Sequence, residues 1–179
     1  IEKGEGNFRI SMTDERAFTL GKNIATAPGK VIYENDLMQL IQYAPTTAQV
    51  YQTPLLLIPA WINKYYIFDL TAERSYIQWL VAKGYTVFVI SWVNPDEKLG
   101  RKNFDHYLRE GPLSALDVIE SVTGSKQTAI LGYCLGGTLS AITLAYLRGM
   151  EDDARVASVT YLTTMVDFSD AGDIAVFID

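Results

Sequence analysis

The chain has 179 residues, of which 49% are apolar and 20% are charged. This length fits one domain with a large core, and the composition excludes disordered, collagen-like and disulfide-rich proteins. The net charge of -6 argues against a nucleic-acid-binding protein, and a single cysteine excludes an internal disulfide and a multi-cysteine metal site.

No apolar stretch approaches the roughly 18 residues that a membrane-spanning helix needs, and no basic-then-apolar leader opens the chain. We therefore expect no membrane span and no metal, and a soluble protein of the reducing cytoplasm. The chain opens on Ile1 rather than Met and closes just after an apolar run that includes Val176, Phe177 and Ile178. We therefore expect a fragment of a longer chain. In the isolated fragment these apolar side chains should be uncovered, and the fold should be marginally stable.

Residues 1–30 are glycine-rich without a sustained period, so they predict a loop-rich lead-in. Lys30–Glu34 and Met38–Tyr43 are rich in β-formers, and the turn residues between them predict an antiparallel hairpin at a sheet edge. The next strands are short apolar runs without alternation, typical of a parallel sheet covered on both faces. They are Leu55–Ile58, Thr86–Ile90 and Thr128–Leu131.

Helical spacing separates these runs. One apolar stripe spans residues 76–81 and stops at Gly84, and a second spans 115–122, entered through Pro112 and closed by Gly124. A third spans 135–146, and the strand Ala157–Leu162 follows it with an open edge. The order predicts an α/β, mostly parallel, doubly wound sheet, present as the N-terminal half of an α/β-hydrolase-like fold. We expect one partial catalytic domain, with the lead-in and hairpin in 1–53 and the α/β core in 54–179.

The motif Gly132-Tyr133-Cys134-Leu135-Gly136-Gly137 lies between a predicted buried strand and a predicted helix. It matches the G-x-S-x-G nucleophile elbow with cysteine in place of serine, and its glycines avoid collisions with neighbouring backbone. The helix N-terminus favours a thiolate at Cys134 and leaves the Leu135 N–H free for an oxyanion. Taken alone, the string is more simply explained by a buried cysteine beside helix-capping glycines. The strand before it and the helix after it favour a nucleophile.

The partners of that nucleophile are harder to find. In α/β-hydrolases the acid and the histidine follow the nucleophile, whereas His106, the only histidine, precedes Cys134. We expect His106 to be a solvent-facing residue and the general base to be absent from these 179 residues. Asp167 follows the last strand and could be an acid, but turn capping is the simpler interpretation. The same turn and cap roles are expected for Asp69, Asp96, Asp170 and Asp173.

Several segments resemble the polyhydroxyalkanoate synthase family, and its short-chain, class I branch above all. The most specific is residues 62–70, I-N-K-Y-Y-I-F-D-L, similar to the family's I-N-K-Y-Y-I-L-D-L box. The lead-in at residues 21–31, the S-W-V-N-P-D segment at 91–96, the cysteine elbow and residues 162–168 follow in family order.

The resemblance implies an enzyme that polymerises (R)-3-hydroxyacyl-CoA into polyester and releases CoA, with Cys134 carrying the chain as a thioester. It implies a histidine and an aspartate farther along the chain, no cofactor besides the acyl-CoA substrate, a homodimer, and a cytoplasmic protein at the surface of polyester granules. Because one thioester exchanges for another at nearly equal free energy, the acyl group stays activated on the cysteine.

The loop at residues 59–62 should supply a second oxyanion donor, for which the backbone N–H of Ile62 is our candidate. Tyr65 and Tyr66 are candidates for a pocket wall, although such aromatics more often pack in a core. Two alternatives stay open: a cysteine α/β-hydrolase that cleaves esters or lactones, and an inactive fragment that only folds or associates. Polymer together with free CoA would appear only with the synthase.

Overall fold

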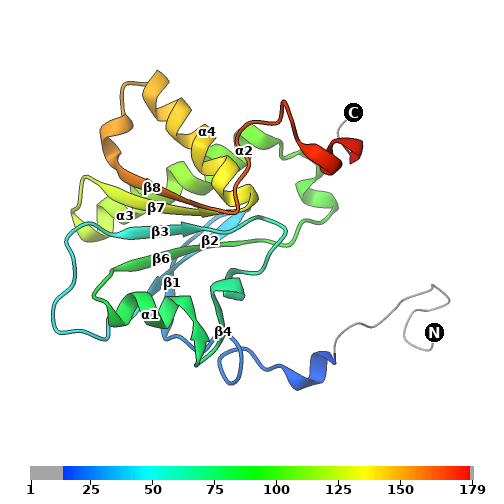
Figure 1. The fold of residues 1–179 in the computed structure, drawn as a ribbon. Coiled ribbons are helices and arrows are strands. Elements are labelled where there is room, and N and C mark those ends of the chain that lie inside the picture. Colours follow the sequence, from blue (N-terminus) through cyan, green and yellow to red (C-terminus); the bar gives the residue numbers. More distant parts are fainter. Residues whose placement is uncertain (1–13, 178–179) are drawn as a thin grey trace.

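A six-stranded, mostly parallel sheet forms the centre of the computed structural model, which describes residues 14–177 (Figure 1). The strands lie in the order β1-β2-β6-β3-β7-β8. The pairs β1–β2 and β2–β6 are antiparallel, and the other three pairs are parallel. The bounds are β1 Gly29–Glu34, β2 Met38–Tyr43, β3 Leu55–Ile58, β6 Val87–Trp92, β7 Thr128–Tyr133 and β8 Val156–Leu162.

Helices cover both faces of this sheet (Figure 1). Helix α1 (Tyr76–Ala82) lies on one face, and α2 (Phe104–Leu108), α3 (Ser114–Thr123) and α4 (Leu135–Gly149) lie on the other. Each face has its own apolar core, because the fully apolar central strands send side chains in both directions. A small hairpin of β4 (Asp69–Thr71) and β5 (Arg74–Ser75), which the sequence did not predict, precedes α1. The predicted α/β architecture is confirmed.

The predicted strands are present, with small changes at their ends. The predicted β1–β2 hairpin forms one edge of the six-stranded sheet, and all four residues of β3 are buried. Strand β6 runs to Trp92 and β7 to Tyr133, two residues beyond the predicted ends in both cases. Strand β8 is the other edge within the described residues, and most of its side chains are exposed or half-exposed.

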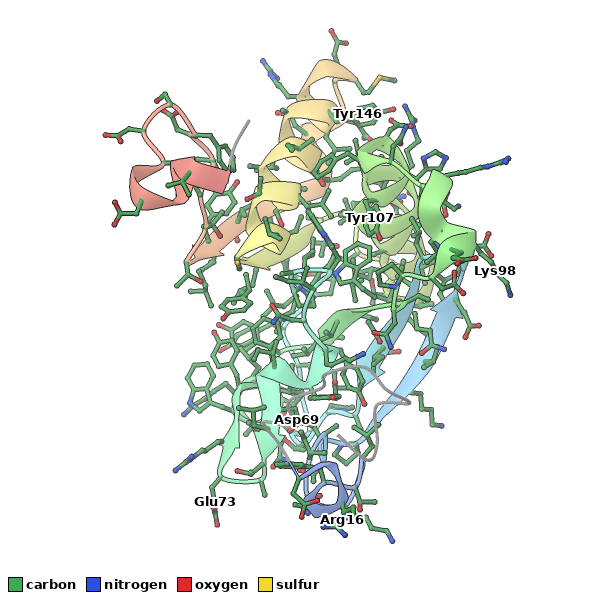
Figure 2. All side chains as sticks on the ribbon, turned by 90° about the vertical axis from the view of Figure 1, so that its right-hand side faces the viewer. Arg16, Asp69, Glu73, Lys98, Tyr107 and Tyr146 are labelled. Atoms are coloured by element: carbon green, nitrogen blue, oxygen red, sulfur yellow. The ribbon has the colours of Figure 1, made fainter. Side chains whose placement is uncertain are left out.

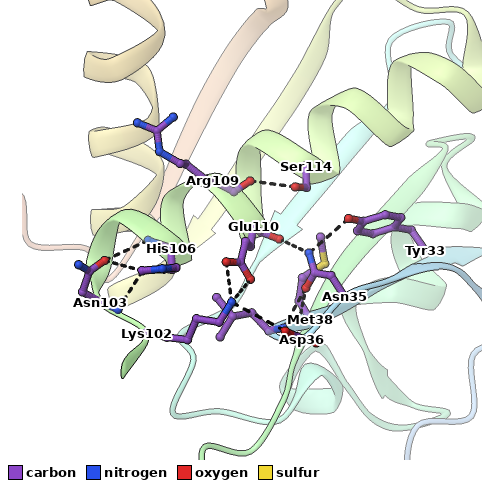
Figure 3. A network of polar contacts seen from close by, with 11 residues as sticks. Tyr33, Asn35, Asp36, Met38, Lys102, Asn103, His106, Arg109, Glu110 and Ser114 are labelled. Atoms are coloured by element: carbon purple, nitrogen blue, oxygen red, sulfur yellow. Dashed lines mark hydrogen bonds and ion pairs between the residues drawn. The ribbon is translucent and has the colours of Figure 1, made fainter. Parts of the chain in front are cut away.

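The predicted helix entry at Pro112 is wrong. The chain is already helical from Phe104, and Pro112 lies inside a π-helical turn, Arg109–Leu113, that joins α2 to α3. Proline cannot donate a helical hydrogen bond, and the ladder of this stretch is locally widened into a π-helical turn. Other groups donate to two carbonyls of this turn. The Ser114 hydroxyl donates to the Arg109 carbonyl at 2.8 Å, and the Asn35 amide donates to the Glu110 carbonyl at 2.7 Å (Figure 3).

Asp69, expected as a turn or cap residue, is fully buried, and its side chain bonds to a distant segment of the chain. Asp69 lies in the part of the molecule near the lead-in (Figure 2). Its Oδ2 accepts the backbone N–H of Ala27 at 2.8 Å, and its carbonyl accepts that of Ala25 at 2.9 Å. Burial, and then the charge of Asp69, raise the pKa of the Tyr43 hydroxyl and also that of Tyr65. Asp69 therefore attaches the lead-in to β4 through both its side chain and its backbone.

No helix within residues 14–177 has the length and apolarity to cross a bilayer. Near the end of this range, Val176 is 76% exposed, as expected for an uncovered apolar side chain. The side chain of Phe177 and the whole of Ile178 lie outside the described residues, so the expectation for them is not tested.

Replacing Asp69 should weaken the attachment of the lead-in in a graded way. Asp69→Ala removes the acceptor for the Ala27 N–H and should lower the free energy of unfolding by about 1–3 kcal/mol. Asp69→Asn keeps one acceptor oxygen and should cost less. Chemical denaturation measures both, and limited proteolysis at residues 14–28 reports the lead-in directly. Equal losses for the two variants would contradict the assigned hydrogen bond.

Candidate active site

Cys134 lies at a sharp turn between β7 and α4. Its backbone has φ 54° and ψ −125°, a conformation that is strained for a residue with a side chain. Hydrogen bonds hold it there: the Cys134 N–H donates to the Leu162 carbonyl at 2.9 Å, and the Cys134 carbonyl accepts from Gly137 N–H at 2.9 Å. The cysteine is partly exposed and unpaired, at the head of the 15-residue helix α4. This is the strand-to-helix turn that the motif predicted.

The three glycines of the turn are required by close backbone approach. A Cβ on Gly132 would lie 2.5 Å from the Cα of Gly137. A Cβ on Gly136 would overlap the Ile58 carbonyl oxygen and come within 2.7 Å of the carbonyl carbon of Pro59. One on Gly137 would overlap the side chain of Thr164. The elbow is thus wedged between the end of β3 and the segment after β8.

The segment after β8 packs over the start of α4, a contact that the sequence did not reveal. The Thr138 hydroxyl donates to the Met165 carbonyl at 2.7 Å, and the Thr164 hydroxyl donates to the Leu162 carbonyl at 3.1 Å. Thr163 has φ 46°, so the chain turns sharply where β8 ends. No residue type in the segment T-T-M-V-D, residues 163–167, indicates a positive φ at Thr163.

Leu135 is the first residue of α4, so its backbone N–H has no acceptor within the helix. The candidate second donor lies on the loop after β3. In this loop the Asn63 N–H donates to the Ala60 carbonyl at 2.9 Å, which closes a turn with Trp61 and Ile62 at its centre. The Ile62 side chain is 71% exposed, and the loop starts from the Pro59 peptide on which Gly136 packs. The elbow and this loop are therefore adjacent.

Tyr65 and Tyr66 are half-buried and pack edge to face, with ring centroids 5.3 Å apart. Both line a cavity of about 420 Å³, and Tyr65 also packs against the apolar core below α1. Cys134 is not among the residues that line this cavity. The residues that do line it are Leu20, Gln39, Lys64, Tyr65, Tyr66, Ser91, Trp92, Val93 and Asn94.

His106 has a structural role in the described fold. It is partly buried rather than fully solvent-facing, and its ring closes a capping box with Asn103 at the start of α2 (Figure 3). The Asn103 N–H donates to Nδ1 of His106 at 3.2 Å, and the Asn103 side chain accepts from the His106 N–H at 3.3 Å. The ring nitrogen nearest the backbone is thus engaged in helix capping.

The exposed Asp167 caps a local turn, as the simpler interpretation had it. Its Oδ1 accepts the backbone N–H of Ser169 at 2.9 Å, and this bond lowers the pKa of the carboxyl. Asp96 likewise accepts from the Lys98 N–H at the start of a 3₁₀ turn. Within residues 14–177, the elbow that carries Cys134 and Leu135 packs on the start of the loop that carries Ile62, and no acid or base is assigned beside it.

This sheet and its elbow define the α/β-hydrolase fold. The chain matches one of two esterases from the fungus Rhizomucor miehei with a TM-score of 0.58 at 14% identity, over 81% of this chain and 47% of the esterase. It matches a sugar hydrolase from Lactococcus lactis with a TM-score of 0.57 at 15% identity, over 79% of this chain and 55% of that one. At these identities the matches establish the fold alone.

Sequence comparison identifies the particular relatives. Residues 1–80 match the family described as the poly-beta-hydroxybutyrate polymerase (PhaC) N-terminus. The whole chain is 54% identical to a poly(3-hydroxyalkanoate) polymerase of Methylorubrum extorquens, and 96% of it is 43% identical to the polymerase subunit of Cupriavidus necator. The chain is thus homologous to one segment of the poly(3-hydroxyalkanoate) polymerases, which confirms the resemblance. It spans about 29% of the length of these two relatives.

The contact between Gly136 and β3 gives a sharp test of the elbow. Gly136→Ala places a methyl group against the Ile58 carbonyl and should destabilise the fold by about 1–3 kcal/mol or more. Gly149→Ala, at the other end of the same helix, meets no atom within 4 Å and should be neutral or slightly stabilising. Denaturation curves compare the two variants. Similar effects of the two substitutions would refute the tight contact.

Proposed function

We propose that this chain is the nucleophile-bearing part of a poly(3-hydroxyalkanoate) polymerase, with Cys134 as the residue that carries the acyl chain. The observation that carries the proposal is the elbow. There a partly exposed cysteine with a strained backbone conformation lies at the N-terminus of a 15-residue helix. The polymerase names of relatives that are 43–54% identical supply the substrate class.

In the proposed reaction, the Cys134 thiolate attacks the carbonyl carbon of a hydroxyacyl-CoA. The negative charge that forms on the carbonyl oxygen is stabilised by the Leu135 N–H and by an N–H of the loop after β3, such as that of Ile62. Collapse of this adduct releases the CoA thiolate, which takes up a proton, and leaves a thioester on Cys134. The acyl-CoA is its own activated donor, so the transfer calls for no further cofactor.

Chain growth then needs a base. The hydroxyl of an incoming monomer loses its proton as its oxygen attacks the acyl carbon, and the new ester forms as the thioester bond to sulfur breaks. We assign this base to a histidine outside these 179 residues, assisted by an aspartate there, because the one histidine present caps α2. On this proposal the chain by itself does not turn over. The homodimer and the granule surface belong to the same proposal, through the resemblance.

A cysteine hydrolase of esters or lactones is the competing enzyme. It would share the elbow but would pass the acyl group to water. Incubation of the complete polymerase with 3-hydroxybutyryl-CoA separates the two: polymer and free CoA support our proposal, and free hydroxy acid with CoA supports the hydrolase.

Loss of the thiol should abolish polymerisation. In the complete enzyme, Cys134→Ala should lower the rate of CoA release by on the order of 10⁴-fold or more. Cys134→Ser should also be poor, because a hydroxyl needs a stronger base than a thiol does. A Cys134→Ala enzyme that kept a tenth of the wild-type rate would rule out Cys134 as the nucleophile.

His106→Gln should leave polymerisation nearly unchanged in the complete enzyme. The effect on stability should also be small, because a glutamine at this position can accept from the Asn103 N–H and so keep the capping box at α2. A general base contributes about 10²–10⁴-fold to a rate. A loss of that size in a folded His106→Gln enzyme would therefore show that the histidine takes part in the chemistry.

A further inference from the structure

Trp92, the last residue of β6, makes a buried hydrogen bond to the loop after β3. Its indole Nε1–H donates to the carbonyl of Pro59 at 2.7 Å, and the Trp92 side chain is 6% exposed. Pro59 is the first residue beyond β3, so this bond holds the loop at the point where it leaves the sheet. The bond crosses from one parallel strand to the end of its neighbour.

The same Pro59 peptide is held from the elbow. Gly136 packs so closely on Ile58 and Pro59 that it has no room for a Cβ. Because a peptide unit is planar, the indole bond to the Pro59 carbonyl also fixes the direction of the next N–H, that of Ala60. The turn from Ala60 to Asn63 therefore starts from a peptide plane held by both Trp92 and the elbow.

The surroundings of Trp92 are shaped around its ring. A Cβ on Gly111 would lie 2.5 Å from the indole Cη2, so the π-helical turn needs a glycine where it crosses the ring. Tyr107 packs against Trp92 with ring centroids 5.4 Å apart, and it also packs against Trp61 at 5.5 Å. Trp61 is in the centre of the loop turn, so the aromatic cluster contacts the loop a second time.

From this arrangement we infer that Trp92 is a positioning residue for acyl transfer: its indole N–H orients the loop that presents the second oxyanion donor to Cys134. The inference rests on the proposed function, because it requires that an oxyanion form beside the elbow. Trp92 itself does not contact the reacting atoms in this account. It acts through the Pro59 peptide.

The role can be separated from general packing by two reactions of the same thiol. Acylation of Cys134 by 3-hydroxybutyryl-CoA passes through an oxyanion, whereas alkylation by iodoacetamide displaces iodide and forms none. A loop that is misplaced but still folded should therefore slow the first reaction and spare the second. Both rates are measured in the complete polymerase in single-turnover experiments, with mass spectrometry of the peptide that contains Cys134.

Two changes at Trp92 remove the donor. Trp92→Phe keeps an aromatic ring but is smaller, and replacement of Trp92 by 3-benzothienylalanine keeps the indole shape with sulfur in place of N–H. Each should slow acylation by about 10- to 100-fold, because an oxyanion donor that is misplaced stabilises the transition state less. Alkylation should proceed at the wild-type rate. Trp79→Phe is the matched control, because Trp79 is 51% exposed on α1, and it should change neither reaction.

The outcomes are distinct. Unchanged acylation in the benzothienyl enzyme overturns the inference even if Trp92→Phe fails to fold, and so does an equal slowing of both reactions, which would indicate a purely structural role. Failure of the proposed function looks different: the wild-type enzyme would not be acylated at Cys134 at all, and both the function and the role of Trp92 would then be rejected together.

Discussion

The close contact between the start of α4 and the end of β3 is the constraint on which the site depends. A helix that begins against the carbonyls of Ile58 and Pro59 can do so only if its second residue has no side chain. That contact places the head of α4, and with it Cys134, beside the loop that follows β3. Two further close contacts complete the turn: Gly132 packs on Gly137, and Gly137 packs on Thr164 after β8.

The strain at Cys134 has to be balanced by the surrounding structure. A non-glycine residue at positive φ costs on the order of 1–3 kcal/mol, and it persists only where neighbours leave no alternative. Here the Cys134 N–H is bonded to the end of β8 and its carbonyl to the first turn of α4. The parallel pairing of β7 with β8 therefore supports the backbone of Cys134 directly.

Much of this arrangement could be predicted from the sequence, because its strongest signals are local. Continuous apolar runs marked the buried strands, and Gly84 and Gly124 marked helix ends that do have positive φ. What could not be predicted depends on contacts between distant segments. The π-helical turn that holds Pro112 accepts a hydrogen bond at Glu110 from Asn35, 75 residues earlier in the chain. The buried Asp69 likewise accepts from Ala27, 42 residues earlier.

The same distinction holds for the site. The elbow could be predicted because Gly132, Cys134 and Gly136 alternate within one short segment of the chain. The capping role of His106 is equally local, because its partner Asn103 is three residues away. Trp92 gave no such signal. Its function depends on a hydrogen bond to a strand that neighbours β6 in space but lies 33 residues away in the chain.

The strand order shows that the segment matched by the family model does not coincide with a unit of the sheet. The PhaC N-terminal family covers residues 1–80, which contain β1, β2 and β3. In the sheet, however, β6 lies between β2 and β3 and pairs with both. Of the six-stranded sheet, a polypeptide cut at residue 80 would hold only the β1–β2 hairpin and β3, which share no hydrogen-bonded ladder. The boundary drawn by sequence similarity therefore passes through the middle of one cooperative sheet.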